Sequence, residues 1–312
     1  MPYDSIISRT DAAALIPQEV SNELLTNLAS QSAALTLFRS TPLSSSQTRF
    51  PVISAMPVAY FVNGDTGQKQ TTEANWDNKY MNVEEIAAIV PIPEAVLDDA
   101  SFDVWSTVRP MLEEAIGRTV DAAVFFGTNK PASWDTAIVT AAVAAGNVVA
   151  RGANAAAAGG IAGDFSDLYA TLEADGYDVN GLITNTTYKG RIRQARDVDG
   201  QPLQDVGGSI FGVTPQYPMR GLWPTGLSAA EAIAGDFTKG ILGVRQDITY
   251  KILDQAVIQD GTGAIQFNLA QQDMVALRVV FRCAFAVANV MNRDQPVEAN
   301  RYPFAVLRSP AS

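Results

Sequence analysis

The sequence contains no histidine among its 312 residues. Histidine is the commonest general base and the commonest metal ligand near neutral pH, so its absence excludes serine–histidine and cysteine–histidine nucleophiles and most zinc sites. The carboxylate pairs Glu84–Glu85 and Asp98–Asp99 do not replace it, because neighbouring residues on a strand point to opposite faces. We therefore predict no catalytic residue, no cofactor site and no metal site, and a chain that is not an enzyme.

Cysteine and long apolar runs are also scarce. The one cysteine, Cys283, can form no internal disulfide, and its apolar surroundings predict a small buried hydrophobe. No apolar run approaches about 18 residues, the length that a transmembrane helix needs. The first ten residues lack the basic and apolar regions of a signal peptide. We expect no membrane partner.

Positive charge is in deficit. The chain has 22 Lys and Arg against 33 Asp and Glu, a net charge of −11. A dedicated nucleic-acid-binding protein exposes an excess of cations to phosphates, so this class is disfavoured. A container for nucleic acid stays open, because a container need not grip its contents. A hydrophobic content of 47% in a chain of this length predicts a folded globule of one or two domains.

The most informative stretch follows residue 81. Val83–Ile92 is an apolar run that predicts a strand. Pro91 and Pro93 end this strand or mark it as an edge strand, because proline lacks the N–H that a sheet ladder needs. A short acidic turn, Glu94–Asp99, comes next.

Apolar residues then recur at steps of three and four, which predicts one long helix with a continuous apolar face. Ser101 is the expected N-cap, and Gly127 is the expected C-terminal stop. Pro110 is expected to bend the helix or to restart it as a first-turn proline. The apolar face consists of Phe102, Trp105, Val108, Leu112, Ile116, Val120 and Ala123.

Residues 48–84 predict a long hairpin. Thr48–Ala59 and Asn75–Glu84 have strand character, and a polar, glycine-bearing tip, Asn63–Thr72, lies between them. No helical pattern in this stretch can cover the hairpin. An isolated two-stranded ribbon is only marginally stable in water, so we expect a partner surface for it.

The N-terminal segment predicts a helix that begins near Pro17. Its apolar face is narrow, and polar side chains fill the rest of the helix surface. Two interpretations stay open: the helix packs on something outside its own domain, or it is an ordinary N-terminal helix on its own core. The face consists of Val20, Leu24, Leu25 and Leu28.

The second half alternates helices and strands. Residues 136–149 fit either a strand or a helix, and residues 151–163 predict a surface loop without a phosphate-binding pattern. Thr186–Arg196 predicts a basic helix that contacts DNA or a neighbour's acidic surface, or is a solvated face. The remaining predicted elements are a helix at Asp164–Asp175 and strands at Gly181–Asn185, Gly240–Leu253, Met274–Val290 and Tyr302–Leu307.

Several phrases of the sequence resemble the tailed-phage major capsid proteins of the HK97 fold. The first is Ala87–Ser101, followed by a late aspartate, Asp121, and an aromatic–glycine stop at Phe126-Gly127. The others are Ala234–Arg245 and Asp273–Arg278. Their order and spacing cover most of the chain.

The resemblance implies an α+β, HK97-like capsid fold. It combines an N-terminal arm, an extended E-loop hairpin, a P-domain with a long spine helix and long β-strands, and an A-domain with a central sheet flanked by helices. The implied division is 1–47 for the N-terminal arm, 48–82 for the E-loop hairpin, 83–130 for the P-domain strand and spine helix, 131–243 for the A-domain, 244–283 for the second part of the P-domain with its P-loop, and 284–312 for the C-terminal part of the A-domain.

The function that the resemblance implies is structural. It is that of a major capsid subunit, assembled in the host cytoplasm, that forms the hexamers and pentamers of an icosahedral shell enclosing the dsDNA genome of a phage. An encapsulin-like cellular nanocompartment shell of the same fold stays open as the alternative. The implied partners are further copies of the chain, a separate scaffolding protein, a portal, a cement protein and packaged dsDNA without sequence-specific contact.

The resemblance also assigns roles to residues. The inter-subunit contacts expected in the E-loop are Phe61, Asn63, Gly64, Lys69, Trp76 and Tyr80. The core of the spine helix is expected to be Phe102, Trp105, Leu112, Ile116 and Val120. Some relatives join their subunits through a lysine–asparagine isopeptide bond assisted by a glutamate. Lys69, Lys79 and Asn268 do not align with that motif residue by residue, so we do not expect cross-linking.

Processing is the last expectation. Many capsid proteins of this fold carry a long, charged, helical scaffolding segment that a protease removes. Here the arm pattern starts almost at once, at Ile6, Ile7 and Ala12–Ile16. We therefore expect that scaffolding is supplied by a separate protein and that the subunit enters the mature shell without a large cleavage.

Overall fold

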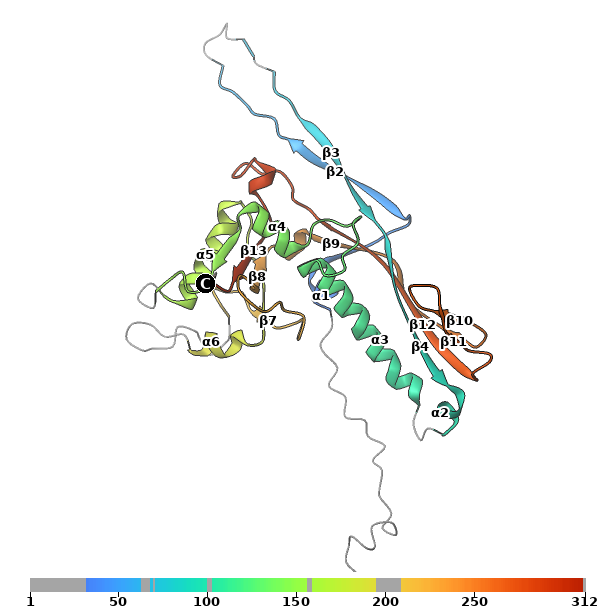
Figure 1. Ribbon diagram of the computed structural model, residues 1–312. Helices are drawn as coiled ribbons and strands as arrows, with labels where there is room; N and C mark the ends of the chain where they lie inside the picture. The colour runs from blue at the N-terminus through green and yellow to red at the C-terminus, as the bar shows by residue number, and fades with distance from the viewer. Residues whose placement is uncertain are drawn as a thin grey trace, which may run out of the picture.

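The structure is a computed structural model that describes residues 32–62, 68–69, 71–99, 103–155, 159–194 and 209–310. Its main parts are two sheets, one long helix and a projecting two-stranded ribbon (Figure 1). We call the four-stranded sheet of order β1-β9-β12-β4 the long sheet. The five-stranded sheet of order β5-β13-β8-β6-β7 is the compact sheet.

The long sheet is built on β12, Met274–Val287, which pairs antiparallel with β9, Gly240–Leu253, and with β4, Glu84–Pro93. The strand β1, Arg39–Pro42, adds to β9 in parallel. The edge position predicted from Pro91 and Pro93 is confirmed, because β4 is the last strand of the sheet. The missing N–H groups therefore interrupt no ladder on the outer side of β4.

The long helix α3, Val104–Asp121, lies alongside the long sheet (Figure 1). Its N-cap is Asp103, whose side chain accepts a hydrogen bond from the Trp105 N–H at 3.0 Å. The predicted cap at Ser101 was two residues too early, because Asp103 satisfies the first free N–H groups of the helix. The helix continues through Pro110, so the predicted restart at this residue is wrong.

The end of α3 matches the predicted stop. A π-helical turn, η1, Ala122–Phe126, follows α3, and Gly127 closes it with a left-handed backbone at φ 77°. On the inner face of α3, Leu112, Ile116 and Val120 are buried, and Trp105 is partly buried against the same core. Phe102 lies outside the described residues.

The compact sheet has helices on both faces. The helices α5, Ile161–Ala174, and α6, Tyr188–Gln194, pack their apolar side chains on one face, and α4, Ile138–Ala145, packs in the main core with the other. Residues 136–149 thus contain both of the structures that the sequence left open, because β5, Val148–Ala150, follows α4. The other strands are β6, Gly181–Thr184, β7, Pro215–Gln216, β8, Ala230–Gly235, and β13, Phe304–Arg308.

The segment just before the ribbon belongs to the core. The helix α1, Ala33–Leu37, and β1 follow one another, and Phe38 between them lies 5.5 Å from Phe125 and 6.1 Å from Phe285 between ring centroids. Residues 33–43, which we expect to belong to an arm over residues 1–47, thus contribute side chains to the core of the subunit. Phe38 and Leu43 fill positions over Gly240 and Gly243 that a β-carbon would occupy. The helix predicted from Pro17 lies outside the described residues.

Further short elements complete the described chain: α2, Glu94–Asp99, η3, Phe237–Lys239, β10, Val257–Gln259, β11, Ile265–Asn268, and η4, Glu298–Asn300. The strands β10 and β11 pair as a small hairpin whose turn is closed by Asp260. Within the described residues, no helix has the length and apolar character needed to cross a membrane.

Candidate inter-subunit surface

The ribbon consists of β2, Gln47–Ala55, and β3, Asn75–Asn82, and extends away from both sheets (Figure 1). Its antiparallel register places alternate residues on opposite faces. One face contains the pairs Thr48–Met81 and Phe50–Lys79, and we call it the docked face. The other contains the pairs Arg49–Tyr80, Pro51–Asn78 and Ile53–Trp76, and we call it the outer face.

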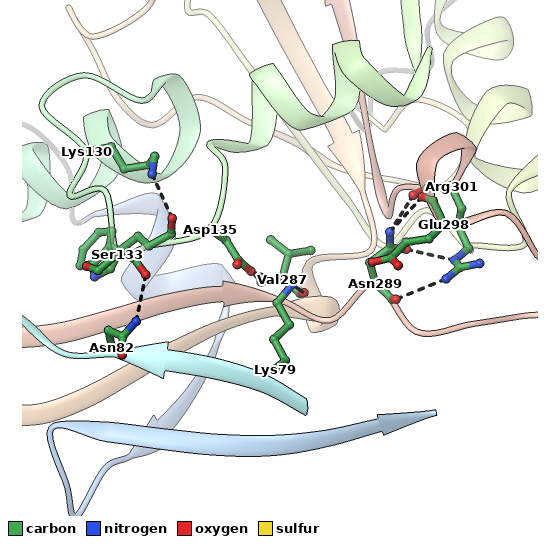
Figure 2. Close-up of polar contacts among 10 residues, drawn as sticks. Lys79, Asn82, Lys130, Ser133, Asp135, Val287, Asn289, Glu298 and Arg301 are labelled. Atoms are coloured by element: carbon green, nitrogen blue, oxygen red, sulfur yellow. Dashed lines mark hydrogen bonds and ion pairs between the residues drawn. The ribbon is translucent and has the colours of Figure 1, made fainter. Parts of the chain in front are cut away.

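The docked face contacts the body of the subunit at its root. Met81 is fully buried with Leu43 and Ala284, and Phe50 packs against the same small cluster. Lys79 makes an ion pair with Asp135 at 2.8 Å and donates a hydrogen bond to the Val287 carbonyl at 2.8 Å (Figure 2). On its docked face, the root of the ribbon is therefore held by an apolar cluster and by the charged contact of Lys79.

The outer face is open to solvent. Ile53 is 43% exposed, Tyr80 is 49% exposed and Trp76 is 70% exposed. In the register, the exposed Pro51 and the polar Asn78 lie between Tyr80 and the Ile53–Trp76 pair. We call Ile53, Trp76 and Tyr80 the apolar strip. Large apolar side chains exposed together on one face are typical of a protein–protein contact. The sequence predicted Trp76 and Tyr80 for this role, and the structure brings them together on one face.

Apolar exposure continues toward the tip of the ribbon. Val58, Tyr60, Phe61 and Val62 are all exposed. With Lys69 and neighbouring residues they line an open pocket of about 510 Å³ between the two chain segments. The Val58 N–H donates to the Thr72 hydroxyl at 2.8 Å across this gap. Asn63 and Gly64, which were predicted as contacts, lie outside the described residues.

A second feature fixes the place where the N-terminal segment joins the subunit. Asp121, at the end of α3, is buried and accepts hydrogen bonds from the Ser32 hydroxyl at 2.6 Å and from the N–H groups of Ala33 and Ala34, each at 2.9 Å. Burial raises the pKa of Asp121, and these hydrogen bonds oppose that shift. The side chain thus caps the N-terminus of α1 from another helix.

The sequence marked Asp121 only by its resemblance to a late aspartate of the spine helix. One physical signal for its role is present, because a carboxylate beside the apolar stripe of α3 needs a buried donor. The donors come from residues 87–89 positions earlier in the chain. Spacing along one sequence does not show such a pairing.

The basic helix predicted at Thr186–Arg196 is directed partly toward its own subunit. Arg191 lies 3.7 Å from the Glu231 carboxylate, which also accepts a hydrogen bond from the Tyr188 hydroxyl at 2.9 Å and pairs with Arg151 at 3.2 Å. Burial and the nearby Glu231 carboxylate raise the pKa of Tyr188. Arg196 lies outside the described residues. Arg191 is therefore a structural cation of the compact sheet.

The carboxylate pair on β4 diverges, as expected for neighbours on a strand. Glu84 accepts a hydrogen bond from the Ser133 hydroxyl, whereas Glu85 lies 3.8 Å from Arg282. Across the part of the chain that the structure describes, no group of three or more histidine, cysteine, aspartate or glutamate side chains could hold a metal ion. Cys283 is buried as predicted, and burial raises the pKa of its thiol to about 12.

Comparisons with known proteins agree with this geometry. A family model described as "Phage capsid family" matches residues 12–291. The chain is 27% identical over 298 residues to the major capsid protein of Staphylococcus phage 80alpha, covering 92% of this chain and 86% of that protein. A solved structure from Microbacterium phage Oxtober96 is 37% identical, covers 98% of this chain and 100% of that chain, and has a TM-score of 0.86.

A solved structure from Mycobacterium phage Cain is 33% identical, covers 98% of this chain and 99% of that chain, and has a TM-score of 0.85. The predicted α+β, HK97-like fold is confirmed by these matches. They are phage proteins, so the alternative of a cellular nanocompartment shell is not favoured. The chain belongs to the phage capsid family and is a major capsid protein, a structural subunit of the virion shell.

Proposed function

We propose that this subunit builds a closed icosahedral shell of hexamers and pentamers around packaged dsDNA, and that the outer face of the ribbon is a main contact between subunits. The observation that carries the proposal is the exposure of three large apolar side chains, Ile53, Trp76 and Tyr80, on that one face. A soluble monomer gains nothing from displaying this strip. A neighbouring copy of the chain can cover it.

The energy available from this contact supports repeated weak association. Burying a large aromatic side chain removes roughly 150–250 Å² from water, and each Å² of apolar surface contributes about 25 cal/mol. Two aromatic residues and one isoleucine can therefore contribute several kcal/mol to each contact before the entropy of association is subtracted. Many such contacts acting together can hold a closed shell.

The proposal also assigns the parts of the structure to the domains that the sequence resemblance implies. The ribbon is proposed as the E-loop, the long sheet with α3 as the P-domain, and the compact sheet as the A-domain. The proposed boundaries at residues 243 and 283 fall inside β9 and β12, which are single continuous strands. We propose accordingly that these two domains share strands and do not hinge at a linker.

The proposal extends to the packaged genome and to three further proteins. The lack of a basic surface excess, with a net charge of −11, favours DNA that is enclosed and not gripped. A separate scaffolding protein, a portal and a cement protein would complete a shell assembled in the host cytoplasm. Catalysis is not part of the proposal, since the family is structural.

The proposal is tested by removing the apolar strip without unfolding the subunit. We expect the double variant W76S/Y80S to stay folded by circular dichroism but to lose closed particles in electron micrographs by at least tenfold. The matched control W76F/Y80F keeps the apolar area and should assemble like the parent chain. Normal shells from W76S/Y80S would show that the outer face is not a main contact.

A further inference from the structure

The ribbon depends on side-chain contacts for its direction. The strands β2 and β3 pair with each other and with no strand of either sheet. The ribbon joins the long sheet at its base, where β1 leads into β2 through residues 43–46 and β3 leads into β4 at Val83. There the Val83 N–H donates to the Ser46 carbonyl at 2.9 Å. Backbone connections at the base alone do not fix the angle between the ribbon and the long sheet. Side-chain contacts must therefore set this angle.

Lys79 is the charged group on the docked face that ties the ribbon to the body. Its ammonium lies 2.8 Å from the Asp135 carboxylate and 2.8 Å from the Val287 carbonyl (Figure 2). The same Asp135 oxygen accepts a hydrogen bond from the Val287 N–H at 2.9 Å. The three residues therefore close a small network between the ribbon, the loop after α3 and the end of β12.

The loop that carries Asp135 is itself held in place. Lys130 donates to the carbonyls of Pro131 and Trp134 at 2.9 and 3.0 Å. The Asn82 side chain donates to the Ser133 carbonyl at 3.3 Å (Figure 2). Trp134 is buried against Phe285 of β12. The position of the Asp135 carboxylate is thus fixed by its loop. An ion pair with a fixed carboxylate restricts where the Lys79 ammonium can lie.

The segment after β12 adds a second fixed point. Asn289 donates to the Arg301 carbonyl at 2.8 Å and accepts from the Arg301 guanidinium at 3.1 Å (Figure 2). From this segment, Arg293 donates to the Pro57 carbonyl of the ribbon at 3.0 Å. Asn292 donates to the Asp175 carbonyl at 2.6 Å, beside the compact sheet. The ribbon is therefore tied to parts of the chain that belong to both sheets.

A small error in direction at the root displaces the outer face. Trp76 lies three residues along β3 from Lys79, a span of about 10 Å at roughly 3.3 Å per residue. A rotation of about 10° at Lys79 therefore moves Trp76 by about 2 Å. Packed contacts lose much of their attraction when atoms separate by about 1 Å, so the outer face must be aimed before it can dock.

We infer that Lys79 is a positioning residue for assembly, which aims the outer face of the ribbon at the neighbouring copy through its bond to Asp135 and Val287. The inference rests on the proposed role of the outer face. The pair is about one-third exposed, with 31% for Lys79 and 28% for Asp135, so solvent screens its contribution to folding. The effect of Lys79 should therefore be larger on assembly than on stability.

The experiment uses the full chain with two spin labels. Thr71→Cys near the tip and Ala170→Cys on α5 are both at exposed positions, and the buried thiol of Cys283 does not compete for the label. Into this background go Lys79→Met, which keeps the alkyl stem, and Lys79→Arg, which keeps the charge and the donors. Lys239→Met removes a lysine from another partly exposed ion pair, Lys239–Asp236, and is the matched control.

We expect Lys79→Met to melt within about 2 °C of the parent chain, because the ion pair is screened. Its label-to-label distance distribution should be at least twice as broad, and its yield of closed particles should fall at least tenfold. Lys79→Arg should restore both quantities, and Lys239→Met should change neither. Asp135→Asn should also broaden the distance distribution. This second variant tests the ion pair without changing residue 79.

The two proposals fail differently. A parent-like distance distribution in Lys79→Met overturns the positioning role, whatever the shells look like. Normal shells from Lys79→Met together with none from W76S/Y80S would overturn it too, while leaving the outer face as a contact. A broad distribution with normal shells from both variants would overturn the role of the outer face and, with it, the positioning of that face for assembly.

Discussion

The compact sheet and the ribbon differ in how many of their side chains they bury. In β8 and β13, 9 of 11 residues are buried, counted as 5 of 6 in the first and 4 of 5 in the second. In β3 only Met81 is buried, and in β2 no residue is. The compact sheet has a complete core within one subunit, whereas the ribbon packs one face on the subunit and exposes the other to solvent. Folding and assembly therefore draw on different residues.

The largest effect on folding is expected from the compact sheet. Phe304 is fully buried and packs 5.3 Å from Phe237 and 6.2 Å from Phe38 between ring centroids. Phe304→Ala removes these contacts and leaves a cavity, so the free energy of unfolding should fall by about 3–5 kcal/mol. Urea denaturation of the isolated subunit measures this loss. A loss below 1 kcal/mol would contradict the complete core that we ascribe to this sheet.

A smaller effect is expected where the N-terminal segment joins α3. Asp121→Ala leaves the Ser32 hydroxyl and the N–H groups of Ala33 and Ala34 without their acceptor. The free energy of unfolding should fall by about 2–3 kcal/mol. Relative to the parent chain, the rate of amide hydrogen exchange should increase more at residues 33–37 than in β13. Equal acceleration in both places would mean that Asp121 holds the whole subunit and not one junction.

The same carboxyl group should give stability a distinct pH dependence. Burial raises the pKa of Asp121 in the folded state above its ordinary value of 3.8. The folded state therefore binds this proton more tightly than the unfolded state, and stability from this group falls as pH rises from about 3.8 through the folded pKa. The difference in unfolding free energy between the parent and Asp121→Asn should decline over that window. A difference that grows with pH would show the opposite shift.

The smallest effect is expected on the outer face. Trp76→Ala removes a side chain that touches solvent over 70% of its surface. The free energy of unfolding of the isolated subunit should change by about 0.5 kcal/mol or less. The measurement is the same urea titration that is used for Phe304→Ala. A loss of 2 kcal/mol or more would mean that the ribbon is held by its own aromatic residues.

The elements that the sequence predicted well are those whose pattern is local. The prolines of β4, the apolar stripe of α3 and the glycine stop at Gly127 each act on their immediate neighbours. The helix α5 and the strand β12 were found for the same reason, and β12 ends at Val287, three residues before the predicted Val290. Periodicity and caps are short-range signals, so one sequence contains them in full.

The elements that the sequence did not predict depend on distant partners. Phe38 belongs to the core because of Phe125 and Phe285, far along the chain, and nothing next to Phe38 separates a core residue from an arm residue. Lys79 is a similar case, because its partner Asp135 lies in a loop that follows α3 in the sequence. The hairpin was predicted, but which of its faces docks is decided by these long-range contacts.

The continuous strands β9 and β12 give the subunit a mechanical property. Each is 14 residues long, and they run antiparallel with ladder partners from Gly240 with Val287 to Leu253 with Ala276. A pull along the strands loads these hydrogen bonds in shear, so the force is shared among the rungs on each side of the register shift between Val280 and Cys283. Tension in a shell wall that is directed along β12 would meet about 46 Å of continuous backbone. The stiff direction of the subunit is therefore the axis of these two strands.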